Sequence, residues 1–144
     1  MRKLLILLLL AGCYSVSTEP IRHKSFTIDG GTFPFPIQVI IEEDPNRASE
    51  LINRYVEDSV SADGFEEVAG YTLMNAEGRP VVIWLSQMSD DPGDIAVANH
   101  ELLHATLAVM RFSGVPLSDE SEETYGYEMQ YLSNQFYKQI NQTK

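Results

Sequence analysis

Residues 95–112 restrict the fold of this chain more than any other segment, because their apolar side chains cover most of the circumference of a helix. Such a helix has to be largely buried between other elements. It nevertheless carries the sequence HELLHATL from residue 100 to residue 107, with two of the chain's three histidines. Buried imidazole and carboxylate groups need partners. We therefore expect His100, Glu101 and His104 to be satisfied by the protein or by a bound ion.

The spacing of the two histidines is typical of a zinc-binding helix. Successive helical residues are about 100° apart, so His100 and His104 lie about 40° apart on one face. Two imidazoles so placed can bind one Zn²⁺, while Glu101 reaches a water on that ion, as in the H-E-x-x-H motif. The alternative is a buried helix whose histidines are hydrogen-bonded within the protein. That alternative explains Glu101 less well, because carboxylates are seldom buried without a partner.

A catalytic zinc site needs a third protein ligand and an open coordination position. The remaining histidine, His23, lies in a segment that we expect to be a solvated tether, so a carboxylate is the better candidate. Four glutamates lie on a last predicted helix, which must fold back antiparallel after a short turn. One of them can face the histidines, while the others form an acidic first turn stabilised by the helix dipole. They are Glu120, Glu122, Glu123 and Glu128.

The two segments together resemble a known arrangement. HELLHATL followed by SEETYGYEMQYL is similar to the gluzincin zinc metallopeptidases, in which a glutamate on a following helix completes H-E-x-x-H. It is more similar still to small metallopeptidase-like proteins of phage and bacterial genomes, with H-E-x-x-H-A and a later E-x-x-A-Y-x-x-x-Y-L. The similarity covers residues 81–136. It places Glu123 at the ligand position, with Gly126 where alanine is usual, and the adjacent Glu122 stays open as an alternative.

The resemblance implies a zinc-dependent peptidase. Glu101 would be the general base that takes a proton from the attacking water and passes it to the leaving amine, with zinc polarising the scissile carbonyl. Tyr127 would donate a hydrogen bond to the oxyanion, although a core tyrosine fits its spacing equally well. Zincins align the substrate on an edge strand beside the site helix, and residues 80–87 are the candidate strand. Asp119 and Asn99 are possible hydrogen-bond partners behind the imidazoles.

The local patterns predict an α+β domain of minimal zincin-like type. About three strands would pack on the H-E-x-x-H helix and a C-terminal helix, with one further helix. A β-branched strand spans residues 37–43. The further helix follows, with Asp44 as N-cap and Pro45 in its first turn, and runs toward Val60.

The second half of the chain contains the other predicted elements. Two apolar runs, residues 71–74 and Val81–Leu85, predict a hairpin whose turn contains Glu77 and Gly78. One of Asp90, Asp91 and Asp94 would cap the apolar helix, which Gly114 ends. Ser118 or Asp119 would cap the last helix.

The first thirteen residues, MRKLLILLLLAGC, have a basic start, a short apolar run and small residues that end at Cys13. The run is shorter than the roughly 20 residues of a membrane-spanning helix and matches a secretory signal. LAGC resembles the lipobox of bacterial lipoproteins, whose cysteine is lipidated after cleavage; the alternative is an ordinary signal peptide with a chance cysteine. We expect a signal peptide over 1–12, a lipidated N-terminus and tether over 13–35, and one domain over 36–144.

Charge and cysteine content limit the partners. The formal net charge is −11, and no basic cluster occurs beyond Arg2 and Lys3, so we do not expect a nucleic acid partner. Cys13 is the only cysteine, which excludes an intramolecular disulfide. The expected partners are a peptide or protein substrate and, through the lipid on Cys13, a bacterial membrane.

Two hypotheses follow for the function. The first is a membrane-anchored zinc metallohydrolase facing the periplasm or the cell exterior, with Zn²⁺ on His100, His104 and Glu123. The second is a non-catalytic cell-envelope lipoprotein, a binding or structural module whose metal site is degenerate or structural. A phage-borne role at the host surface is a narrower form of either hypothesis.

Overall fold

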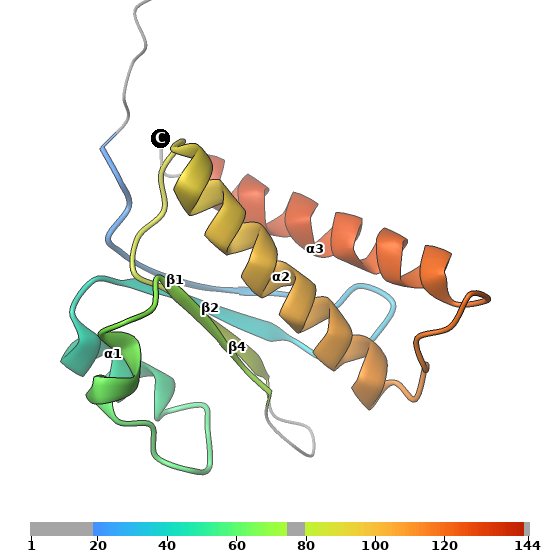
Figure 1. Cartoon of the computed structure of the whole chain (residues 1–144), viewed down its shortest axis with the longest axis horizontal. Helices are drawn as coiled ribbons and strands as arrows, with labels where there is room; N and C mark the ends of the chain where they lie inside the picture. The colour runs from blue at the N-terminus through green and yellow to red at the C-terminus, as the bar shows by residue number, and fades with distance from the viewer. Residues whose placement is uncertain (1–18, 75–79, 143–144) are drawn as a thin grey trace, which may run out of the picture.

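Figure 1 shows the computed structural model, which describes residues 19–74 and 80–142. A four-stranded sheet lies between two layers of helix. Helices α2 (Pro92–Phe112) and α3 (Glu122–Asn141) cover one face, and α1 (Pro45–Ile52) with a short 3₁₀ helix (Ala62–Phe65) covers the other. The α+β class is confirmed, with four strands where about three were expected.

The strand order is β1-β2-β4-β3, with β1 at His23–Ile28, β2 at Ile37–Glu42, β4 at Val81–Leu85 and β3 at Gly70–Leu73. The two central strands, β2 and β4, are parallel, and each edge strand is antiparallel to its neighbour. Parallel neighbours need a crossover connection, which here contains α1. The predicted hairpin pairing of β3 with β4 is confirmed, whereas its turn, with Glu77 and Gly78, lies outside the described residues.

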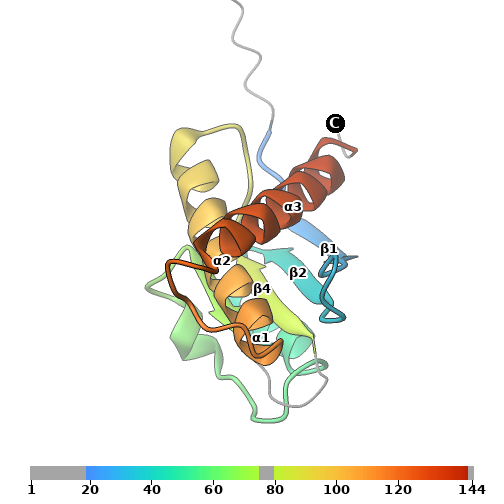
Figure 2. The same cartoon turned by 90° about the vertical axis from the view of Figure 1, so that its right-hand side faces the viewer.

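The prediction that residues 80–87 form an edge strand was wrong, because their strand, β4, lies inside the sheet. Among the described strands, the one at this edge is β3, since it pairs with β4 alone in the strand order. Helix α2 packs on both β3 and β4, and α3 packs on β1; Figure 2 shows the two helices over the same face of the sheet. The edge strand beside α2 is therefore β3, the first strand of the hairpin rather than the second.

Every residue of β2 and β4 is buried, because helices cover both faces of the sheet. Alternate side chains point to alternate layers. The side facing α2 and α3 includes Ile37, Val39, Ile41, Val81, Ile83 and Leu85. Ile40, Val82 and Trp84 pack on the α1 side, where the Trp84 indole N–H donates to the Glu42 carbonyl oxygen at 3.0 Å.

Helix α1 begins as predicted and ends earlier. The Asp44 carboxylate accepts from the backbone N–H groups of Asn46 and Arg47, with Pro45 at the first position. The helix ends at Ile52 rather than near Val60. Two hydrogen bonds instead hold the following residues as a loop. Val60 N–H donates to Asn53 Oδ1 at 2.8 Å, and Asn53 Nδ2 donates to the Val60 carbonyl at 3.2 Å.

Strand β1 lies within the predicted tether, so the prediction of a tether over residues 13–35 was wrong for residues 23–28. The strand pairs with β2 over its full length. Its exposed polar residues alternate with inward-facing ones, and Phe26 meets the Phe136 ring of α3 at a centroid distance of 5.9 Å. The predicted signal peptide 1–12 and Cys13 lie outside the described residues.

Candidate metal centre

Helix α2 is positioned by its ends. The Asp91 carboxylate accepts from the Gly93 N–H at 2.7 Å and caps the start, which selects one of the three predicted caps. Gly114 follows the end with a φ of 73°, a left-handed conformation that favours glycine. The cap of α3 is Ser121, not Ser118 or Asp119, and its side chain makes no hydrogen bond to the helix N–H groups.

The two motif histidines converge. Their Nε2 atoms are 3.0 Å apart, and the rings meet edge to face with centroids 4.6 Å apart. Two nitrogen atoms bound to one tetrahedral Zn²⁺ at about 2.0–2.1 Å lie about 3.3 Å apart. The observed spacing is therefore within a few tenths of an ångström of that required for a shared ion. His100 is exposed and His104 half-buried, so the pair is accessible from solvent.

Glu101 points away from solvent and has a partner on the sheet. It is 5% exposed, and its Oε2 accepts a hydrogen bond from Thr72 Oγ1 of β3 at 2.6 Å. The same hydroxyl lies 3.1 Å from the Glu101 carbonyl oxygen. Sequence analysis missed Thr72, because its role depends on how β3 packs on α2. The available signal was a hydroxyl among the apolar residues of that strand.

A shallow pocket of about 420 Å³ lies between α2 and the start of β3. His100 and Glu101 line it together with residues 68–70 and 96–97. Gly70 permits the close approach of strand and helix, since an added Cβ would lie 2.8 Å from Val97 Cγ1 and 3.0 Å from Glu101 Cγ. The predicted base and one predicted metal ligand thus share one cavity beside the sheet edge.

The predicted third ligand is not brought to the histidines. Among residues 19–74 and 80–142, no three His, Cys, Asp or Glu side chains form a group that could hold a metal ion. Glu122 and Glu123 are exposed in the first turn of α3, which follows the C-terminal end of α2. The two histidines and the acidic turn are therefore separate features of this structure.

Helix geometry distinguishes the two glutamates. Tyr125 lines a hollow with Leu107 and Arg111, which follow His104 by three and seven residues and so lie on its side of α2. Glu122 is about 60° from Tyr125 around α3, whereas Glu123 is about 160° away. Of the two, Glu122 is therefore the one on the Tyr125 side of α3.

The other predicted site residues lie elsewhere. Tyr127 is 68% exposed and lines a different pocket, on the β1–β2 loop, not the one at His100. Asn99 Oδ1 accepts from the Tyr137 hydroxyl at 3.0 Å and so joins α2 to α3 rather than orienting an imidazole. Asp119 is exposed. His23 is on β1, with its Nδ1 3.0 Å from Glu42 Oε1.

Within the described part of the chain, no helix is long and apolar enough to cross a membrane. The lipid anchor at Cys13 stays a prediction, since that residue is outside the described ranges.

Comparisons of the chain with protein-family models, with curated proteins and with solved structures found no match. The resemblance to gluzincins therefore depends on the sequence pattern of residues 81–136 alone.

Proposed function

We propose that this protein is a zinc-dependent hydrolase of peptide bonds, attached by a lipid on Cys13 to a bacterial membrane and facing away from the cytoplasm. The observation that carries the proposal is the convergence of the His100 and His104 Nε2 atoms to 3.0 Å, with Glu101 buried between α2 and the edge strand. This combination of two imidazoles and an adjacent carboxylate is what the H-E-x-x-H chemistry requires.

The donor set fits a zinc ion in part. His100 and His104 would hold it, and Glu122 or Glu123 would complete the protein ligands if the first turn of α3 moved toward the pair. When bound, zinc supplies a Lewis acid that polarises water and a carbonyl group. Glu101 takes the proton of the attacking water and delivers it to the leaving amine. The hydrogen bond from Thr72 holds the Glu101 carboxylate in position for that transfer.

The sheet edge supplies a place for an extended peptide. Strand β3 is antiparallel to β4 and is the last strand on this side of the sheet. A peptide can pair with such an edge through main-chain hydrogen bonds. Tyr71 and Met74, at and just after β3, are 48% and 47% exposed and would contact its side chains. The pocket lined by His100 begins at the same strand, so the bound peptide would pass the histidines.

Zinc content and turnover test the proposal together. Wild-type protein purified with added zinc should contain about one Zn²⁺ per chain by mass spectrometry, and Glu101→Gln should keep the zinc but lose peptide hydrolysis. Preparations of wild-type protein with almost no zinc would remove the proposal.

A second function is favoured by one observation, that the described residues place no third ligand beside the histidines. In that case the protein is a non-catalytic envelope lipoprotein, and its histidine pair is structural or degenerate. Glu101→Gln separates the two functions, because it would leave partner binding by such a module unchanged and would abolish the turnover of an enzyme.

A further inference from the structure

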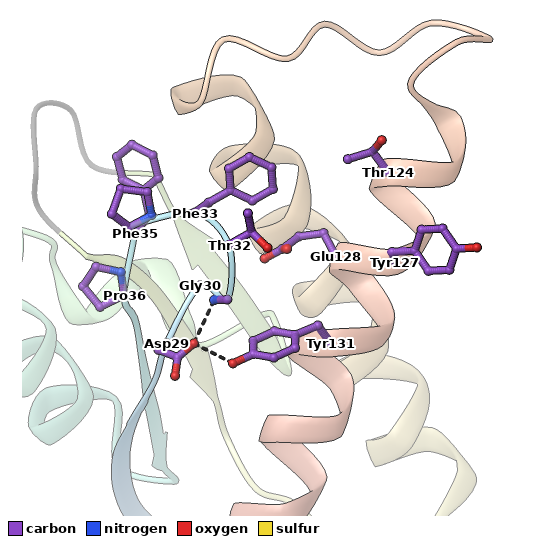
Figure 3. A pocket seen from close by; sticks show the side chains of 12 residues that line it. Asp29, Gly30, Thr32, Phe33, Phe35, Pro36, Thr124, Tyr127, Glu128 and Tyr131 are labelled. Carbon is purple, nitrogen blue, oxygen red and sulfur yellow. Dashed lines mark hydrogen bonds between the residues drawn. The ribbon is translucent and has the colours of Figure 1, made fainter.

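A second and larger pocket lies between α3 and the loop that joins β1 to β2 (Figure 3). Its volume is about 850 Å³. Residues 29–36 form one side, and Thr124, Tyr127, Glu128 and Tyr131 of α3 form the other. The pocket contains neither the two motif histidines nor Glu101, and it holds two candidate site residues of the sequence, Tyr127 and Glu128, apart from them, so the proposed hydrolysis leaves it without a role.

Glu128 is the unusual residue of this pocket. It is 6% exposed, and its buried Oε1 has no hydrogen-bond partner among residues 19–74 and 80–142. Figure 3 shows its side chain directed from α3 toward the loop at Thr32. Burial raises the pKa of this carboxyl, and the negative charge of Asp29 raises it further. Buried polar atoms in folded proteins nearly always have a partner, so this oxygen is an acceptor suited to a donor from outside the chain.

The surroundings of Glu128 favour a positive donor. Asp29 Oδ1 accepts from the Tyr131 hydroxyl at 2.7 Å and from the Gly31 N–H at 2.8 Å. These two hydrogen bonds lower the pKa of Asp29, so it stays ionised at the same pocket. Phe33 and Tyr131 add aromatic rings to the lining, whereas the Tyr127 ring points away from Glu128 (Figure 3), and aromatic faces attract cations.

We propose that this pocket binds an organic cation, the guanidinium or ammonium group of an arginine or lysine side chain or of a small amine. The charged head donates to Glu128 Oε1 near Asp29, and its alkyl part lies on the aromatic wall. An anion would be repelled by the two carboxylates. A bare metal ion fits less well, because the described residues offer no three acidic, histidine or cysteine ligands together.

The test is a titration of the ¹⁵N-labelled full chain, in non-ionic detergent at mildly alkaline pH, followed by NMR. Three probes are compared: Nα-acetyl-arginine amide, agmatine and the neutral isostere Nα-acetyl-citrulline amide. The two cations should shift the amides of Gly30, Gly31 and Thr32 saturably, and the citrulline probe should not. Tighter binding of the acetylated amino acid indicates a peptide side chain as the natural ligand, and tighter binding of agmatine indicates a free amine.

Variants connect binding to the pocket. Glu128→Gln should weaken agmatine binding by about tenfold or more, since it removes the charged acceptor. The matched control Glu50→Gln, which removes one exposed charge on α1, should change nothing. Phe33→Leu removes an aromatic ring of the loop while keeping an apolar side chain there, and it should weaken binding by about two- to fivefold. His100→Ala should bind agmatine normally, so failure of the proposed metal site leaves this result intact.

Three results would overturn the proposal. They are the absence of a saturable shift up to about 20 mM cation, where even weak ligands are detected, equal binding of the citrulline probe, and unchanged affinity in both Glu128→Gln and Phe33→Leu.

Discussion

Replacing Thr72 by valine should lower the free energy of unfolding by about 1–2 kcal/mol. Its hydroxyl donates to Glu101 Oε2 at 2.6 Å, a short bond of the kind made to charged acceptors. Hydrogen bonds to charged groups contribute about 1.5–3 kcal/mol. Glu101 is 5% exposed, so water replaces the lost donor poorly, whereas Thr72 is half-buried and admits some water. A loss near the lower end of that range, or slightly below it, is therefore expected.

Valine is the right replacement because it keeps the β-branched shape and the strand preference of threonine. The change then removes the hydroxyl with little effect on packing. Thr72→Ser keeps a donor and should recover most of the loss. Urea unfolding can be followed by the fluorescence of Trp84, the only tryptophan, which is 1% exposed in the folded protein.

A double-mutant cycle isolates the contact itself. In a Glu101→Gln background the effect of Thr72→Val should fall to less than half, because the acceptor is no longer charged. A Thr72→Val protein within about 0.3 kcal/mol of wild type would refute the reasoning, since a buried carboxylate that loses its donor must cost more than that. If Thr72→Ser lost as much free energy of unfolding as Thr72→Val, that result would also refute the reasoning.

Three further predictions follow from particular contacts. Gly70→Ala should destabilise the protein by about 1–3 kcal/mol, since its new Cβ would lie within 3.1 Å of three side chains. Gly126→Ala, with nothing within 4 Å, should stabilise it by about 0.5–1 kcal/mol, and thermal unfolding of both variants checks this pair. Burial raises the pKa of Glu128, so the folded state holds its proton more strongly than the unfolded state, and stability is lost as pH rises from the unfolded pKa through the folded one. The stability of Glu128→Gln relative to wild type should increase over that pH window in urea titrations, and a difference that does not vary with pH would contradict the assignment. His104→Ala should abolish stoichiometric zinc binding by calorimetry, whereas His23→Ala, on the opposite edge strand, should retain it.

The elements that sequence analysis predicted correctly are those specified by nearby residues. Strands β2 and β4 are continuous apolar runs, and the start of α1 is fixed by Asp44 and Pro45. Strand β1 escaped prediction because half of its residues are polar and exposed. Its identity as a strand depends on pairing with β2, a contact that no local pattern contains.

The candidate site divides in the same way. One turn of helix is enough to place His100 beside His104, so their convergence could be predicted from spacing. The position of a third ligand depends instead on how α3 sits against α2. Two hydrogen bonds fix the position of α3 along α2. The Tyr137 hydroxyl donates to Asn99 Oδ1, and the Tyr125 hydroxyl donates to the Val115 carbonyl at 2.8 Å. Neither contact is visible in the sequence.

The first turn of α3 is also held in place independently of the histidines. Ser121 Oγ donates to the Pro116 carbonyl at 2.6 Å, and the Tyr125 hydroxyl donates to the carbonyl of the preceding loop residue, Val115. Movement of Glu122 toward His104 would have to break or bend these contacts. An exposed turn with few buried side chains can open at modest cost, and the proposed metal centre requires such an opening if Glu122 or Glu123 is to join it.

Two glutamates, nearly equally buried, show why burial alone does not identify a site. Glu101 and Glu128 are 5% and 6% exposed, and both lie on helices. Glu101 meets the Thr72 hydroxyl, so the fold itself supplies a donor for its carboxylate. Glu128 has an oxygen without a donor and an acidic neighbour in Asp29. Because a buried acceptor is costly without a partner, the first arrangement is complete within the chain, and the second is completed by a proton or by a cation bound from solution.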